Sequence, residues 1–505
     1  MLGRKVAAGG ALMVSARLIT RFIDLIAMLF LARILAPADF GLVAIAASVV
    51  SITEATLEIP VNQALVRLPV ITRCQYDTAF TLSLIRGLIL TALLPLAAVP
   101  FSYFYGEPRL VTLICVLSLA PAARGLMSPR LAEFQKEMSF WRDFALELAG
   151  KVASFGASIT IALVTGSYWS IAVGTIILPI ISSAGSYILA PYRPRLSLAE
   201  LPIFKGFVGW MSAAQIISAL NWQFERLLLG KTETTARVGL FSASSDVAGI
   251  PYLAFFGPIL RPLLAGFSKI STDRDRLAES YLTSLGVVGA IGFPLLVGES
   301  LVAEPAVRLI LGPQWASAAP LVAWLSLSLI PALLALPAVP LVMCFGQTRL
   351  LIYRNLIEVM VKIPLAIIGL LSFGLGGIIA ARFLSELAAG AYSMLLVKRL
   401  TGISAARQLK VSWRSGLACC VMVPPVLLVR HMLSAPTGAL DAALSLVTLG
   451  IVGCVVYVFS IWAVWCLCGR PPGAEEAAHR MGTDLAKGLW RRARAVGGDG
   501  RRLKV

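Results

Sequence analysis

The chain has 505 residues, of which 58% are hydrophobic and only 14% are charged, and its mean hydropathy is +0.84. Soluble proteins carry about 25% charged residues, so this chain lacks the polar surface that a water-soluble fold needs. The formal net charge of +18 would suggest nucleic acid in a soluble protein. Basic residues that retain loops in the cytoplasm explain it better here, so no nucleic-acid partner is expected.

Apolar segments long enough to cross a bilayer recur along the whole chain, since spanning takes roughly 20 residues. They predict an all-α polytopic membrane protein with about fourteen transmembrane helices. The expected spans are about 11–34, 40–62, 78–102, 109–127, 143–165, 168–190, 205–229, 238–259, 280–299, 317–344, 354–373, 376–397, 413–431 and 440–468. Basic residues gather in alternate connections, which predicts that both termini are cytoplasmic. The basic start of the chain is expected to be retained as the first span rather than cleaved.

The chain also repeats itself in a preserved order. Ala38–Leu42 (ADFGL) resembles Ala236–Leu240 (ARVGL), and Ala184–Tyr187 (AGSY) recurs as Ala389–Tyr392 (AGAY). Two copies of six spans imply parallel lobes related by a pseudo-two-fold axis along the membrane normal. The expected organisation is a six-helix lobe at 1–190, a cytoplasmic linker at 191–204, a second six-helix lobe at 205–400, two additional helices at 413–468 and a basic cytoplasmic tail at 470–505.

The first span, Gly10–Leu35, carries an unusual set of charges. Arg17, Arg21 and Asp24 are spaced i, i+4, i+7, which places them on one stripe of a helix. Ionised residues at a helix centre cost about 2.5–3.5 kcal/mol each on insertion and usually face a bundle interior or a watery cavity. Two interpretations remain open: the stripe lines a central cavity, or it is an internally paired structural cluster.

The second and third spans add further charges. Ser51, Glu54, Glu58 and Asn62 are expected along one face of the second span because their spacing follows the helical repeat. Glu54 and Glu58 are either structural partners of the arginines or a site for a proton or cation that drives transport. Arg86 in the third span either lines the cavity or extends to the cytoplasmic interface.

Later spans carry scattered polar residues. Gln215 and Arg226 lie along one side of the seventh span, and Asp246 lies in the eighth. Arg226 is near the outer end of its span, where extension to the interface is the alternative to cavity lining. Glu358 and Lys362 are four residues apart in the eleventh span and are expected to form an interfacial pair.

Together these residues predict a cationic cavity suited to phosphate, since guanidinium groups bind phosphate oxygens bidentately. The predicted substrate-binding residues are Arg17, Arg21, Arg86, Gln215 and Arg226. The predicted charge-balancing or ion-coupling residues, which would carry protons or sodium, are Asp24, Glu54, Glu58 and Asp246. No metal, cofactor or catalytic site is predicted: the eight cysteines form no CxxC pair, and the sequence has no complete phosphate-binding loop.

One stretch carries a family resemblance. After a glycine-rich start, Leu31–Ala46 (LARILAPADFGLVAIA) resembles the Wzx-type polysaccharide-export flippases of the polysaccharide transporter family. That family belongs to the MOP superfamily, together with MATE antiporters and the lipid II flippase. The resemblance covers essentially residues 1–470 and implies two six-helix lobes plus two terminal helices.

The resemblance implies a substrate and a location. The substrate would be an oligosaccharide repeat unit on undecaprenyl pyrophosphate, moved by alternating access from the cytoplasmic to the periplasmic leaflet of the bacterial inner membrane. Membrane lipids and a polysaccharide polymerase or export machinery are the other expected partners. The rival hypotheses are a MATE-like cation-coupled multidrug antiporter and a membrane enzyme that polymerises or ligates the same sugars. The antiporter needs an acidic cavity, and the enzyme ordinarily needs a large periplasmic loop.

Overall fold

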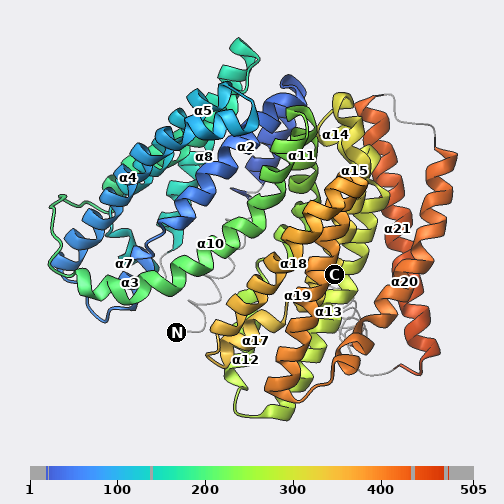
Figure 1. Cartoon of the computed structure of the whole chain (residues 1–505). Helices are drawn as coiled ribbons and strands as arrows, with labels where there is room; N and C mark the ends of the chain where they lie inside the picture. Colours follow the sequence, from blue (N-terminus) through green and yellow to red (C-terminus); the bar gives the residue numbers. More distant parts are fainter. Residues whose placement is uncertain (1–18, 21, 137–139, 434–437, 471–475, 477–505) are drawn as a thin grey trace, which may run out of the picture. The chain divides into compact units, whose positions relative to one another are not determined.

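The structure is a computed structural model, and it describes residues 19–20, 22–136, 140–433, 438–470 and 476 (Figure 1). Throughout these residues the regular structure is helical, beginning with a helix that includes residues 22–34. The helices that follow are α2 (Pro37–Thr56), α3 (Val61–Arg67), α4 (Arg73–Tyr105), α5 (Arg109–Leu117), α6 (Leu119–Gly125), α7 (Leu131–Lys136), α8 (Phe140–Thr165), α9 (Trp169–Leu189), α10 (Leu201–Thr232), α11 (Thr235–Pro251), η1 (Tyr252–Phe256), α12 (Leu260–Lys269), α13 (Arg274–Leu301), α14 (Ala303–Ile310), η2 (Pro313–Ala318), α15 (Ala319–Ser328), α16 (Ile330–Ala335), α17 (Ala338–Cys344), α18 (Arg349–Phe373), α19 (Leu375–Thr401), α20 (Ala405–Met432) and α21 (Ala439–Leu467).

Long apolar helices dominate the described part of the chain, which confirms the predicted all-α membrane fold. Eleven of them are long and apolar enough to cross a bilayer. The predicted number of fourteen stays a prediction, because residues 11–18 and 21 of the first span lie outside the described residues. Two predicted spans are interrupted: the fourth is divided between α5 and α6, and the tenth consists of α15, α16 and α17.

The second predicted span ends earlier than expected. Helix α2 stops at Thr56, and Leu57 leaves the helical conformation with φ −106° and ψ 18°. The chain then passes through Pro60 into the separate helix α3, and proline disfavours a helical residue before it and has no N–H to continue the helix. The expectation that Glu58 and Asn62 share one helical face with Glu54 is therefore wrong.

The helices group into two compact units. Unit 1 comprises Met1–Ile250, Ala303–Leu325 and Ile352–Ser385, and unit 2 comprises Pro251–Val302, Ser326–Leu351 and Glu386–Val505. The core of unit 1 includes Leu42, Ile45, Phe241 and Trp315, all nearly inaccessible to solvent. The core of unit 2 is built around side chains such as Phe256, Leu296, Leu333, Met422 and Leu449. The predicted division into consecutive lobes at 1–190 and 205–400 stays a prediction.

Candidate functional site

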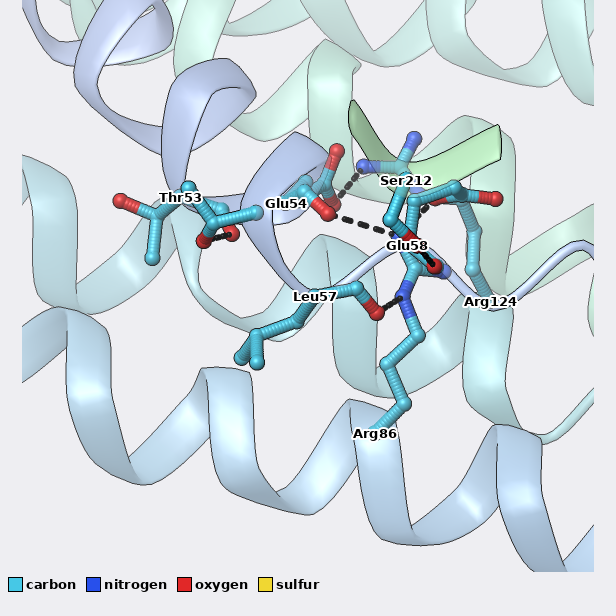
Figure 2. A network of polar contacts seen from close by, with 8 residues as sticks. Thr53, Glu54, Leu57, Glu58, Arg86, Arg124 and Ser212 are labelled. Atoms are coloured by element: carbon cyan, nitrogen blue, oxygen red, sulfur yellow. Dashed lines mark hydrogen bonds and ion pairs between the residues drawn. The ribbon is translucent and has the colours of Figure 1, made fainter. Parts of the chain in front are cut away.

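Two ion pairs meet at the C-terminal end of α2 (Figure 2). Arg124 of α6 contacts Glu54, with 2.6 Å between Nη2 and Oε1. Arg86 of α4 pairs with Glu58, which follows the end of α2. Two guanidinium groups from two different helices thus converge on two carboxylates, and we call these four residues the charge cluster.

Arg86 also binds the backbone at the end of α2. Its Nε donates to the carbonyl oxygen of Leu57 at 2.9 Å, and its Nη2 donates to that of Glu54 at 3.2 Å. The last carbonyls of a helix have no partner within the helix and carry partial negative charge, so a cation is favourable there. The hydroxyl of Ser212 in α10 adds a 2.7 Å hydrogen bond to the carbonyl of Glu58. The early end of α2 is therefore what creates this site, because it exposes carbonyls that a continuous helix would use.

The four charged side chains differ in their access to solvent. Arg124 is 43% exposed, whereas Glu54 is 19%, Arg86 is 20% and Glu58 is 29% exposed. Burial raises the pKa of Glu58 above its usual value, and the charge of Arg86 offsets part of that rise. Arg124 is thus the cation of the cluster that is most available to a ligand. Arg124 lies near the end of the predicted span 109–127, and nothing in its spacing links it to Glu54.

The other predicted site residues lie in separate places. Arg17 and Arg21 are outside the described residues. Asp24 pairs with Lys151 of α8, and Arg226 of α10 pairs with Asp246 of α11 at 2.7 Å. Gln215 is exposed on α10. The roles predicted for these residues stay predictions, but Arg86, Glu54 and Glu58 are the ones that the structure brings together.

A buried group of charges connects α10 with α18. Glu358 is 2% exposed and lies 3.5 Å from the Nζ of Lys362 and 3.4 Å from the Nη1 of Arg354. Asn221 of α10 donates to Glu358 at 2.5 Å, and Lys362 donates to the carbonyl of Asn221 at 3.3 Å. The expected interfacial position of Glu358 and Lys362 is therefore wrong: the pair is buried, and the i, i+4 spacing could not distinguish the two settings.

One turn further along α10, a second buried acid has a basic partner. Glu225 is 2% exposed and lies 3.0 Å from Arg382 of α19. Arg382 also donates to the hydroxyl of Ser245 in α11 at 2.8 Å. The Arg382 side chain is only 13% exposed. Asn221 and Glu225 are four residues apart, so one face of α10 is anchored to both α18 and α19 by charged side chains.

These features define a polytopic membrane protein, and its fold is shared with solved structures of a lipid flippase and a multidrug transporter. The structure matches the lipid II flippase MurJ in an inward closed conformation with a TM-score of 0.68 at 15% identity, over 91% of this chain and all of that one. It matches a multidrug resistance MATE family transporter of the MOP superfamily with a TM-score of 0.60 at 14% identity, over 76% of this chain and 96% of the other. At these identities the likeness concerns the fold alone.

The chain belongs to the polysaccharide biosynthesis protein family, whose sequence model matches residues 30–320. It is 26% identical to the lipopolysaccharide biosynthesis protein WzxC of Escherichia coli (strain K12) over 73% of this chain and 76% of that protein. It is 24% identical to the succinoglycan biosynthesis transport protein ExoT of Rhizobium meliloti (strain 1021) over 59% of this chain and 61% of that one. The resemblance inferred from Leu31–Ala46 is confirmed.

Proposed function

We propose that this protein is a flippase that moves undecaprenyl-pyrophosphate-linked oligosaccharides from the cytoplasmic to the periplasmic leaflet of a bacterial inner membrane. Family membership supports a role in polysaccharide biosynthesis, and the name of the relative ExoT supports transport. The MOP fold, shared with a lipid flippase, supports a lipid-linked cargo. The family is one of transporters, so no catalytic step on the sugar is assigned to this chain.

The observation that carries the proposal is the charge cluster at the end of α2. A diphosphate presents several oxygens to two guanidinium groups, and paired hydrogen bonds of this kind are strong. Glu54 and Glu58 hold Arg124 and Arg86 in place when no substrate is bound. On this mechanism the diphosphate replaces a carboxylate as the partner of Arg124, the more exposed of the two arginines. Arg17, Arg21, Gln215 and Arg226 stay proposed as further substrate-binding residues.

The energy source belongs to the proposal as well. Asp24, Glu54, Glu58 and Asp246 are acids placed in or beside the membrane-spanning helices, and protonation or sodium binding there would couple transport to an ion gradient. The charge cluster offers one way to couple transport to protons, because a proton on Glu58 would weaken its attraction for Arg86. The distribution of basic residues supports a cytoplasmic position for both termini.

Export of a repeat unit tests the proposal. The wild-type chain should restore surface polysaccharide in a strain that makes the matching lipid-linked repeat unit but lacks its own flippase. Arg124→Ala should lower export at an equal amount of protein, and Arg17→Ala/Arg21→Ala should do the same. Arg109→Ala is the matched control, since Arg109 forms an exposed pair with Glu107 at 3.0 Å. Full export by the Arg124→Ala variant would remove the charge cluster from substrate binding.

A MATE-like antiporter is the alternative function. The fold is shared with a MATE family transporter as well as with a flippase, so the fold match does not distinguish the two functions. Cells that express the chain would then resist cationic dyes. Such resistance, without restored polysaccharide export, would overturn the proposed function.

A further inference from the structure

The first turns of α2 and α11 are in direct backbone contact. Gly41 is the fifth residue of α2, and Gly239 is the fifth residue of α11. A Cβ built on Gly41 would lie 1.7 Å from the carbonyl oxygen of Thr235, and a Cβ on Gly239 would lie 1.8 Å from that of Pro37. Each glycine therefore rests on the first residue of the other helix, and no side chain fits at either position.

This contact is reciprocal, and the two helix starts carry similar sequences. Ala38–Leu42 (ADFGL) and Ala236–Leu240 (ARVGL) are corresponding segments of the two sequence repeats. A hypothetical Cβ on each glycine would also come within 2.9 Å of the backbone nitrogen of the other glycine. The two predicted repeats thus meet here with glycine, the smallest residue, on both sides.

A dry, closed environment surrounds the contact. Leu42 and Val238, next to the two glycines, are fully buried, and Ile45 and Phe241 are each 1% exposed. All four belong to one continuous hydrophobic core. Close backbone approach of this kind is stabilised by packing, and it has no flexible side chain that could yield.

The segment made of α14 and η2 fastens the same region. The indole N–H of Trp315 donates to the carbonyl of Ala32 at 2.8 Å, and its ring meets that of Phe40 edge-on at 5.1 Å. Gln314 donates to the carbonyl of Leu35 at 3.1 Å. Ser244 of α11 donates to the carbonyl of Ala318 at 3.3 Å. One segment from the second repeat thus bonds both to the first repeat and to α11.

We propose that the Gly41–Gly239 contact, fastened by Trp315, is a gate between the two repeats, observed here in its closed state. The inference rests on the proposed transport function, since a gate matters only if a cargo passes between the repeats. Closure requires the two helix starts to touch, so it depends on glycine at both positions. Opening separates α2 from α11 and releases the bonds that Trp315 and Gln314 make.

Water access to Ser244 measures the state of this gate. Ser244 is fully buried in the closed state, so a Ser244→Cys substitution creates a thiol that a water-soluble maleimide reaches only after opening. Labelling is measured on the full chain in permeabilised membranes, relative to the same protein without Ser244→Cys. Gly41→Ala and Gly239→Ala should each raise the labelling rate by about ten- to a hundredfold, because an extra methyl group in a packed contact disfavours closure by that factor.

Two further variants make the result decisive. Gly156→Ala is the matched control, because a Cβ at Gly156 meets nothing within 4 Å, and it should leave labelling unchanged. Trp315→Phe keeps a smaller aromatic ring but removes the indole N–H and its hydrogen bond to Ala32, and it should raise labelling at least about fivefold. It also decides the outcome if the glycine variants do not accumulate in the membrane.

If Gly41→Ala were labelled at the parental rate, the proposed gate would be refuted. Where the glycine variants fail to fold, labelling of Trp315→Phe at the parental rate would refute it. The assay needs no substrate, so it is independent of the export assay. A wild-type chain that fails to restore export would overturn the proposed function while leaving the labelling result intact.

Discussion

Removing the buried carboxylate of Glu358 should destabilise the protein strongly. Glu358→Gln preserves the shape and an acceptor for Asn221, but it removes the carboxylate that pairs with Lys362, whose side chain is only 4% exposed. Removing one partner of a buried ion pair costs about 3–5 kcal/mol, since the remaining charge is left uncompensated. Lys362→Met should cost less, about half as much by the same reasoning, because Glu358 keeps Arg354 as its partner.

The order of the two variants is the sharper expectation, since Glu358→Gln breaks two ion pairs and Lys362→Met breaks one of them. Apparent unfolding free energies can be compared by titration with a denaturing detergent in mixed micelles. Arg237→Ala is the control, because Arg237 is 60% exposed in its pair with Glu233, and exposed pairs contribute about 0–1 kcal/mol. If Glu358→Gln destabilised no more than this control, or less than Lys362→Met, the electrostatic account of the α10–α18 connection would be refuted.

Three smaller predictions concern other parts of unit 1. Tyr192→Phe removes the 2.5 Å bond from the tyrosine hydroxyl to the buried Asp77 and should cost about 1.5–3 kcal/mol, measured by the same titration. Burial raises the pKa of Glu58 above 4.5. Between pH 4.5 and the raised native pKa, Glu58 is therefore protonated in the native state and ionised in the unfolded chain. The stability advantage of wild type over Glu58→Gln should therefore shrink as the pH rises from 4.5 through the raised native pKa, and a constant difference would contradict this assignment. Gly156→Ala should raise the unfolding free energy by up to about 1 kcal/mol, because alanine is the better helix former.

Hydropathy alone predicted most of the membrane-spanning helices, and several ends are close. The spans expected at 354–373, 376–397 and 440–468 correspond to α18, α19 and α21. The burial of twenty consecutive apolar residues is a strong signal that tertiary contacts rarely override. The early end of α2 was missed although Pro60 is visible in the sequence, because an apolar run was continued across it.

The site was predicted only in part, since a sequence does not show which helices meet. Glu54, Glu58 and Arg86 stood out as charges inside apolar spans, and they do lie together. Arg124 was overlooked because a basic residue at the end of a span is normally a topological signal. Gly41 and Gly239 were visible as repeat partners, but their contact depends on a helix-to-helix distance that no pattern in the sequence encodes.

Helix α2 connects the two features on which the proposals rest. From Gly41 to Glu54 the helix rises about 20 Å, so the glycine contact and the charge cluster lie at well-separated levels along α2. The contacts at the two ends differ in kind. The backbone contact at Gly41 is either formed or absent, because glycine has no side chain that could bridge a gap there. The carboxylates at the other end can exchange one partner for another, since the arginines accept any oxygen anion of suitable geometry. A charged substrate can therefore compete for Arg86 and Arg124 without disturbing the glycine contact, and binding at one level can precede opening at the other. Alternating access requires that order, and a single rigid helix with two unlike ends provides it.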